Sequence, residues 1–244
     1  MVPAGTGRTE LDDPSGTPDG SPRSPGQAAM ATQQVAITRM SAVELPEAGR
    51  VLGAAFVSSP LEQALRGTID DRQRRGLVRA YTATCRLPGK VSVAWRADRI
   101  VGAIRWVESP RCQLRWSQKL VMAPTAIAAF GRKLPRAMTW VAAWSMRDPS
   151  EPHVHLGPIG VEPALQGHGI GSQMLAVYCE QLDLAGDAGY LETDKPENVR
   201  LYERFGFEVR RHAFVLGVQN WFMWRQPTRH SAIASQPWPI DPGR

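Results

Sequence analysis

Residues 165–174, LQGHGIGSQM, place three glycines at alternate positions immediately before a run with helical character. A glycine inside a helix costs about 1 kcal/mol relative to alanine, because its backbone loses more freedom on folding. Gly167, Gly169 and Gly171 are therefore expected where a ligand approaches the backbone closely. The first turn of a helix carries free N–H groups and a partial positive charge, so the pattern predicts a cradle for pyrophosphate.

The segment that precedes this loop reads as a strand that opens at its end. Residues 153–161, HVHLGPIGV, are mostly apolar but contain Pro158. Proline cannot donate to a strand ladder, so the strand should bulge or separate from a neighbour there. Glu162 and Pro163 then form a turn into the glycine loop.

Two familiar phosphate-binding motifs fail on spacing. A dinucleotide fingerprint, G-x-G-x-x-G, would need a glycine where Ser172 stands, and a P-loop would need a lysine after its last glycine. The pattern Q-x-x-G-x-G does fit, from Gln166 to Gly171. A glycine-rich helix start without any ligand is the plainer alternative.

The loop resembles the acetyl-CoA loop of the GNAT N-acetyltransferase superfamily, whose signature is Q/R-x-x-G-x-G/A. Residues 160–163, GVEP, supply the strand end and turn that this family places before the loop. Residues 191–209, LETDKPENVRLYERFGFEV, resemble its second hallmark, in which a short strand precedes an asparagine and Y-x-x-x-G-F. This second segment is similar to the puromycin N-acetyltransferase branch. The resemblance is strong over 154–209, fair over 35–107, weak over 112–147 and absent from both tails.

The resemblance implies one α/β domain, with a mixed central sheet that has an antiparallel N-terminal part, a splayed parallel strand pair and helices on both faces. Strands are expected at 35–40, 153–161, 190–194, 207–215 and 220–225, and a hairpin over 90–108 with its turn at 97–99. Helices are expected at 45–60, 66–84, 169–184 and 198–205, and two more within 112–147, entered at Pro124 and Pro135.

The ends of the chain differ in composition from the middle. Residues 1–29 are rich in Pro, Gly, Ser and Thr, so a disordered tail is expected, followed by the domain at 30–227 and a second flexible tail at 228–244. Translation from Met30 instead of Met1 is a hypothesis that the same pattern raises.

Composition narrows the class of protein. The 244 residues have an ordinary apolar share of 43%, and no apolar run reaches the roughly 18 residues of a membrane span. No signal pattern opens the chain, so a cytoplasmic enzyme is expected, as a monomer or homodimer. Cys85, Cys112 and Cys179 lack metal-type spacing and are interpreted as reduced structural thiols.

The net charge of +6 arises largely between Arg66 and Arg111. Binding of nucleic acid is one interpretation, and a solvated helix face or attraction for a polyanionic small molecule is the plainer one. Nucleic acid is disfavoured because Asp70 and Asp71 interrupt the run and no nucleic-acid motif accompanies it.

Acetyl transfer from a thioester to an amine needs a base for the ammonium proton, donors for the oxyanion and a proton for the thiolate. Tyr202 is the candidate acid, because the resemblance places its counterpart near the CoA sulfur and the counterpart of Asn198 on the cofactor. Asn198 and Tyr202 share one helix face, whereas Leu201 and Phe205 are expected on the core face. A packed tyrosine bonded to backbone is the alternative.

Glu192 is the candidate base, acting through water, because it lies on the short strand beside the opening. Asp194 should point to the same side. A surface or ion-paired carboxylate is the alternative, and His155 could serve instead. His153 and His155 share a strand face, but the sequence places no third ligand, so no metal site is expected.

The expected cosubstrate is acetyl-CoA. The resemblance implies that N–H groups near Ile159 and Val161 serve the pantetheine arm and thioester oxygen, and that the glycine loop takes the pyrophosphate. The loop residues are Gln166, Gly167, His168, Gly169, Ile170, Gly171 and Ser172.

The acceptor is expected to be a small amine, although a peptide N-terminus fits equally well. Aromatic residues of the expected acceptor region should line the core or a groove. An acyl-CoA-binding regulatory module without turnover is the alternative to an enzyme. The aromatic residues are Phe56, Trp106, Trp116, Trp140, Trp144, Trp221 and Trp224.

Overall fold

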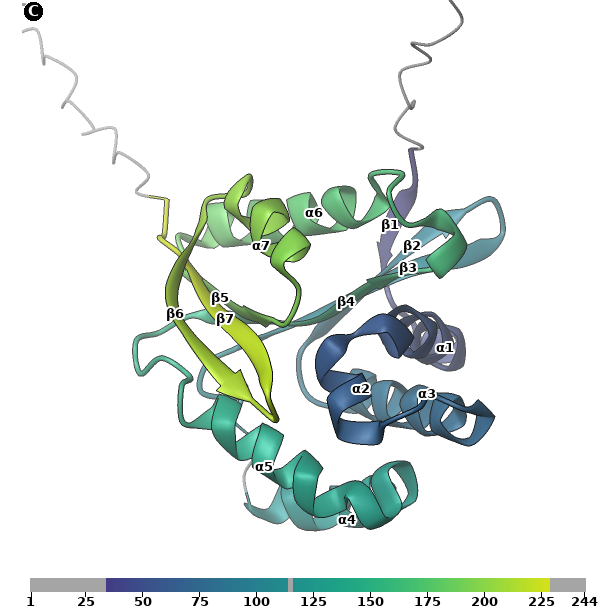
Figure 1. Cartoon of the computed structure of the whole chain (residues 1–244). Coiled ribbons are helices and arrows are strands. Elements are labelled where there is room, and N and C mark those ends of the chain that lie inside the picture. Colours follow the sequence, from purple (N-terminus) through teal and green to yellow (C-terminus); the bar gives the residue numbers. More distant parts are fainter. Residues whose placement is uncertain (1–33, 114–115, 229–244) are drawn as a thin grey trace, which may run out of the picture. The chain divides into compact units, whose positions relative to one another are not determined.

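Seven strands form one mixed sheet in the order β1-β2-β3-β4-β5-β7-β6 (Figure 1). The computed structural model describes residues 34–113 and 116–228. Among the neighbouring strands only β4 and β5 run parallel, so the expected mixed sheet with an antiparallel N-terminal part is confirmed. The strands are β1 (Ala36–Arg39), β2 (Lys90–Arg96), β3 (Arg99–Glu108), β4 (Val154–Val161), β5 (Gly189–Thr193), β6 (Phe207–Val215) and β7 (Val218–Arg225).

Helices cover both faces of the sheet, as expected. Figure 1 shows α6 (Ile170–Ala185) and α7 (Pro196–Glu203) on one face, and α1 (Leu45–Ala55) and α3 (Asp71–Arg86) on the other. Met174, Leu175 and Tyr178 of α6 are buried in the first of two main core clusters, and Val51 and Leu77 are buried in the second. Because both faces are covered, β3 is buried along almost its whole length.

The sheet opens between β4 and β5. These strands pair only from Val154 to Leu156, which lie opposite Gly189 to Leu191. Beyond that point, the register of β4 against β3 shifts across Gly157 and Pro158. Pro158 cannot donate to a ladder and a bulge redirects the strand, so the expected separation is confirmed.

The glycine loop enters α6 through left-handed backbone. Gly167 and Gly169 have φ values of +81° and +80°, and Gly169 is the residue that caps the helix. Residues that carry a side chain rarely adopt this backbone conformation, so the backbone itself requires glycine at both positions. A Cβ added to Gly167 would meet no protein atom within 4 Å, so the space beside it is open.

The expected single helix over 45–60 is wrong. α1 ends at Ala55, a short 3-10 turn follows at Phe56–Ser58, and a further helix, α2 (Pro60–Arg66), begins. Ser59 caps α2, since its hydroxyl accepts a hydrogen bond from Glu62 N at 3.2 Å. A serine followed by a proline is a helix-start signal, and here it overrides the apolar periodicity.

The expected entry of a helix at Pro124 is also wrong. α4 (Trp116–Phe130) contains Pro124 in its interior, whereas α5 (Leu134–Ser145) does begin around Pro135. Among the described residues, no helix combines the length and the apolar character that a bilayer crossing requires.

Arg66 does not belong to a basic surface. It is buried at the end of α2, where its Nε donates to Glu62 Oε2 at 2.7 Å and its Nη1 donates to Ala129 O at 2.9 Å. The basic run therefore begins with an ion pair buried within α2, and the Arg66–Ala129 hydrogen bond connects α2 to α4. The expected helix of this region is α3.

Candidate active site

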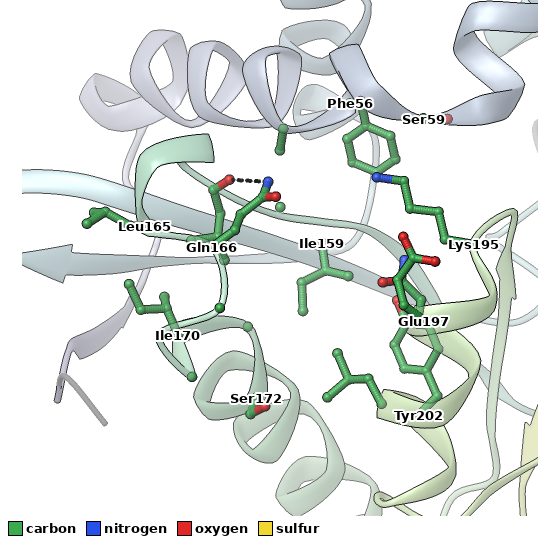
Figure 2. Close-up of a pocket in the computed structure, with 18 of the residues that line it drawn as sticks. Phe56, Ser59, Ile159, Leu165, Gln166, Ile170, Ser172, Lys195, Glu197 and Tyr202 are labelled. Carbon is green, nitrogen blue, oxygen red and sulfur yellow. Dashed lines mark hydrogen bonds between the residues drawn. The ribbon is translucent and has the colours of Figure 1, made fainter. Parts of the chain in front are cut away.

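A cavity of about 490 Å³ lies where β4 and β5 separate. Figure 2 shows Gln166 and Ile170 on one side of it and Lys195 and Tyr202 on the other. The cavity therefore brings together the segments on which the sequence predicted cofactor contacts. The predicted residues that line it are Ile159, Val161, Gln166, Gly167, Gly169, Ile170, Gly171, Ser172, Asn198 and Tyr202.

The start of α6 presents backbone donors to this cavity. The first hydrogen bond of the helix runs from Gln173 N to Gly169 O at 3.1 Å. The N–H groups of the preceding helical residues, Ile170 to Ser172, therefore have no acceptor within the helix. Together with the positive end of the helix dipole, they form a site suited to an anion.

Two side chains of the loop donate hydrogen bonds to nearby backbone carbonyls. Gln166 Nε2 donates to Val161 O at 3.1 Å, which ties the loop to the end of β4. His168 is not among the residues that line the cavity, and its Nδ1 donates to Gln166 O at 3.0 Å. The structure thus gives His168 a role within the loop.

Tyr202 is a buried tyrosine whose hydroxyl has no hydrogen-bond partner among the described residues. The other three tyrosine hydroxyls donate to protein oxygens at 2.7 to 3.3 Å. Burial, with a smaller contribution from the charge of Asp194, raises the pKa of Tyr202 above its usual range, so the phenol stays protonated at neutral pH. The three partnered tyrosines are Tyr81, Tyr178 and Tyr190.

The faces of α7 differ from the expectation. Tyr202 is the buried residue of the helix, whereas Leu201 and Phe205 are only partly buried against the same core cluster. Asn198 lies one turn before Tyr202, and its Nδ2 donates to Thr193 Oγ1 at 3.3 Å. Asn198 and Tyr202 both line the cavity, as the shared face predicted.

A second cavity of about 350 Å³ adjoins the first, and the two share Ile159, Asn198 and Tyr202 among their lining residues. Its walls are aromatic, with a stacked Phe56–Tyr81 pair whose ring centroids are 4.5 Å apart. Trp140 and Trp144 of α5 meet edge to face at 5.2 Å and line the same cavity.

The remaining predicted aromatic residues lie elsewhere. Trp106 and Trp224 are buried in the core, and Trp221 is partly buried against it. The side chain of Trp116 lies outside the described part of the chain. Three of the seven aromatic residues named from the sequence, Phe56, Trp140 and Trp144, thus line the second cavity.

The side chains of Glu192 and His155 are hydrogen-bonded to each other. Glu192 Oε2 lies 2.7 Å from His155 Nε2, and only 3% of the Glu192 side chain is exposed. Burial alone would lower the pKa of His155, but the charge of Glu192 and a hydrogen bond with Asp148 raise it well above its usual range. The two candidate bases of the sequence therefore form one pair on the wall of the second cavity.

Asp194 points to the same cavity as Glu192, as the strand alternation predicted. Its Oδ2 accepts hydrogen bonds from Ser59 Oγ at 2.6 Å and Leu61 N at 2.8 Å. Asp194 therefore holds the start of α2 beside the site.

Two residues near this wall were missed from the sequence. Cys112, interpreted there as a structural thiol, and Asp148 lie beside His153 and His155. No local pattern links them, because Cys112 and Asp148 are 36 positions apart and the fold alone brings them together.

The sequence and the fold of this chain are similar to those of known acetyltransferases. The model of the acetyltransferase (GNAT) family matches residues 69–207, more than half of the chain. The chain belongs to the GNAT acetyltransferase family. A Corynebacterium glutamicum structure, described as histone acetyltransferase HPA2 and related acetyltransferase, is similar with a TM-score of 0.60 and 18% identity, over 82% of this chain and 99% of that one.

Two further relatives of this GNAT chain differ in extent. The polyamine N-acetyltransferase of Drosophila melanogaster is similar in fold, with a TM-score of 0.54 and 14% identity over 79% of this chain and all of that one. A mycothiol acetyltransferase of Brachybacterium faecium is 37% identical over 54 residues, which cover 21% of this chain and 16% of that protein. The puromycin N-acetyltransferase branch stays a prediction.

Proposed function

We propose that this chain is an acetyl-CoA-dependent N-acetyltransferase that acts on a small amine. The observation that carries the proposal is the meeting of two cavities at Tyr202. One is built around backbone donors at the start of a helix, and the other has aromatic walls and a buried carboxylate.

The first cavity fits the expected cosubstrate. The N–H groups from Gly167 to Ser172 would bind the pyrophosphate, and the open space beside Gly167 leaves room for phosphate oxygens. Beyond Leu156, β4 no longer pairs with β5, so the backbone near Ile159 and Val161 is available to the pantetheine arm. Asn198 would contact the same arm.

The residues of the second cavity would carry the proton transfers. Bound acetyl-CoA supplies an acetyl group on a thioester, and the amine nitrogen forms a bond to that carbonyl carbon while the C–S bond breaks. Glu192, oriented by His155, takes the ammonium proton through water. Tyr202, protonated and without a protein partner, donates its proton to the departing thiolate. The nitrogen loses its second proton to solvent as the amide forms, and the Tyr202 phenolate regains a proton from solvent.

The chemistry of the second cavity favours one class of acceptor. Its rings suit a flat or apolar body, and Glu192 and Asp194 attract the ammonium group that such a body carries. We therefore propose an amine with an aromatic or apolar body, and puromycin is one compound of this class. A peptide N-terminus would share the ammonium but not the flat body.

The test is release of thiol from acetyl-CoA in the presence of an amine panel. Puromycin and arylalkylamines should give a kcat/KM at least about tenfold above that of aliphatic polyamines, the difference that one buried apolar group supplies. Binding of acetyl-CoA without thiol release for any amine would favour the non-catalytic acyl-CoA-binding module instead.

A further inference from the structure

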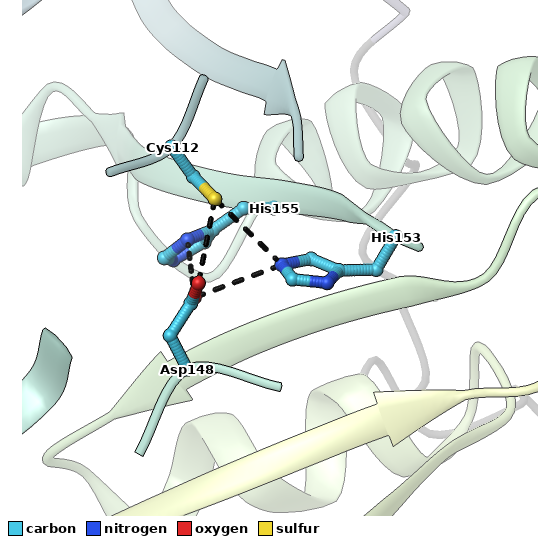
Figure 3. A group of neighbouring side chains, drawn as sticks. All are labelled: Cys112, Asp148, His153 and His155. Carbon is cyan, nitrogen blue, oxygen red and sulfur yellow. Dashed lines mark hydrogen bonds and ion pairs between the residues drawn. The ribbon is translucent and has the colours of Figure 1, made fainter. Parts of the chain in front are cut away.

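Four potential metal ligands meet beside the second cavity, and three of them, Cys112, Asp148 and His155, line it (Figure 3). Cys112 lies in the loop after β3, Asp148 follows α5, His153 precedes β4 and His155 lies on β4. One donor atom from each lies within 4.8 Å of all the others. Such a set of sulfur, nitrogen and carboxylate oxygen is typical of a zinc site.

Four separations within the cluster are close to those between the ligands of a tetrahedral zinc ion. Asp148 Oδ1 lies 3.6 Å from His153 Nε2 and 3.5 Å from His155 Nδ1. Cys112 Sγ lies 3.4 Å from Asp148 Oδ2 and 3.9 Å from His153 Nε2. Zinc bonds of about 2.0 to 2.3 Å require ligand atoms about 3.3 to 3.6 Å apart in a tetrahedral site. These four separations are close to that spacing, and the ligand atoms as a set, which lie within 4.8 Å of one another, would draw in by up to about 1 Å around an ion.

The outer nitrogen of each histidine has an acceptor that fixes its tautomer. His153 Nδ1 donates to Glu151 O at 2.7 Å, so Nε2 is the nitrogen that faces the cluster. His155 Nε2 lies 2.7 Å from Glu192 Oε2 and donates to it, which leaves Nδ1 toward the cluster. Carboxylate and carbonyl acceptors behind ligating histidines are the usual outer shell of a zinc site.

The Asp148 carboxylate makes only long contacts within the cluster, since its Oδ1 lies 3.5 to 3.6 Å from the two histidine nitrogens. Asp148 Oδ1 is buried and has no hydrogen-bond partner among the described residues. A sulfur, a carboxylate and two imidazole nitrogens face one another, and a cation at their centre would bind all four once the thiol and the imidazoles give up their cluster-side protons.

We propose that Cys112, Asp148, His153 and His155 bind one zinc ion. With four protein ligands the site is closed, so the ion is structural and does not enter the reaction. It ties the loop after β3 and the end of α5 to β4, and holds the ring of His155 that contacts Glu192. This inference does not rest on the proposed acetyl transfer, because its evidence is the geometry of the four ligands alone, although the outer partner Glu192 is also the proposed base.

The test is metal content of the full-length protein after dialysis against metal-free buffer. We expect about one zinc per chain, and Co²⁺ in its place should give the intense bands of a tetrahedral thiolate site. Cys112→Ala should lose the Co²⁺ band that arises from the thiolate. Asp148→Asn should no longer bind one zinc per chain. Cys85→Ala is the matched control, since that thiol is buried in the second core cluster, and it should keep both.

Folding is followed in parallel by circular dichroism. If Cys112→Ala does not fold, chelator treatment of the unmodified chain replaces it, and zinc should restore a lowered Tm where Mg²⁺ does not. Metal well below one equivalent after exposure to zinc would overturn the proposal. An unchanged Co²⁺ spectrum in folded Cys112→Ala would overturn it as well.

Discussion

Tyr202 has a hydroxyl that no described residue uses, at the junction of two cavities. Tyr202→Phe keeps the ring and its packing, so the Tm should stay within a few degrees and the Kd of acetyl-CoA should change little. The proposed proton donor is lost, so kcat should fall by about 10²-fold. A thiol-release assay measures kcat, and calorimetry measures the Kd of acetyl-CoA, so the two effects can be separated.

Tyr178→Phe is the matched control for that variant. Its hydroxyl donates to Val154 O at 2.7 Å in the core, away from both cavities. Its loss should lower the free energy of unfolding by about 1 to 3 kcal/mol while kcat stays near that of the unmodified protein. Equal kcat in the Tyr202 and Tyr178 variants would contradict the assignment of the acid.

Glu192→Gln removes the proposed base but keeps an oxygen that can accept from His155. We expect kcat/KM to fall by about 10² to 10⁴-fold, the usual contribution of a general base, with little change in acetyl-CoA affinity. Glu208→Gln, an exposed change on β6, should leave both unchanged. Steady-state kinetics with a saturating amine measure the effect. Undiminished turnover in Glu192→Gln would contradict the assignment of Glu192 as the base.

Single residues were predictable where they lie inside a motif. Tyr202, Asn198 and Glu192 stand at positions that the resemblance marks, and the structure places all three at the cavities. The Glu192–His155 pair spans 37 positions and two strands, so no local pattern could reveal it. The grouping of Cys112 with Asp148 was hidden for the same reason.

At the scale of elements, the N-terminus of α6 provides the sharpest test of cofactor binding. A Cβ at Gly171 would meet only Val161 Cγ2, at an ordinary 3.8 Å, and the backbone there is helical. Gly171→Leu should therefore unfold no more easily than the unmodified protein, since leucine favours helices by up to about 1 kcal/mol. Its longer side chain enters the first cavity, so acetyl-CoA affinity should fall more than about tenfold.

Gly171→Ala is the control, because the family signature accepts alanine at this position. Its acetyl-CoA affinity, measured by calorimetry, should stay close to that of the unmodified protein. If Gly171→Leu also binds normally, the cavity at the start of α6 does not hold the cofactor.

The buried Arg66–Glu62 pair stabilises α2 beside the site. Removing Arg66 leaves a carboxylate whose pKa burial has already raised, together with an unpartnered Ala129 O. Arg66→Ala should therefore lower the free energy of unfolding in urea by about 3 to 5 kcal/mol. The double change Arg66→Met with Glu62→Leu should be less destabilising than Arg66→Ala alone, and the reverse order would contradict this account.

Most elements followed from local patterns, and the exceptions have local causes. β6 and α5 appear where alternation and an early proline indicated them. α2 was missed because its seven residues are too few for a periodicity to show. Pro124 looked like a helix start, but α4 accommodates it internally, since packing against α3 outweighs one lost hydrogen bond.

At the scale of the whole molecule, residues 30–228 hold the entire sheet and both cavities. Thr228 is included because its hydroxyl donates to Asp183 Oδ1. A chain cut to these residues should match the full chain in Tm and in acetyl-CoA affinity, by thermal melting and calorimetry. A loss of affinity in the shortened but folded chain would mean that the terminal segments take part in the site.

The claim on which the account depends is that the glycine loop and the opening between β4 and β5 bind acetyl-CoA. The most direct measurement is calorimetric titration of acetyl-CoA, with CoA as the comparison, into the full-length protein. We predict one site per chain with micromolar affinity, lost in Gly171→Leu and kept in Gly171→Ala. Absence of heat from a well-folded protein would mean that LQGHGIGSQM is only a glycine-rich turn, and would contradict the proposed activity.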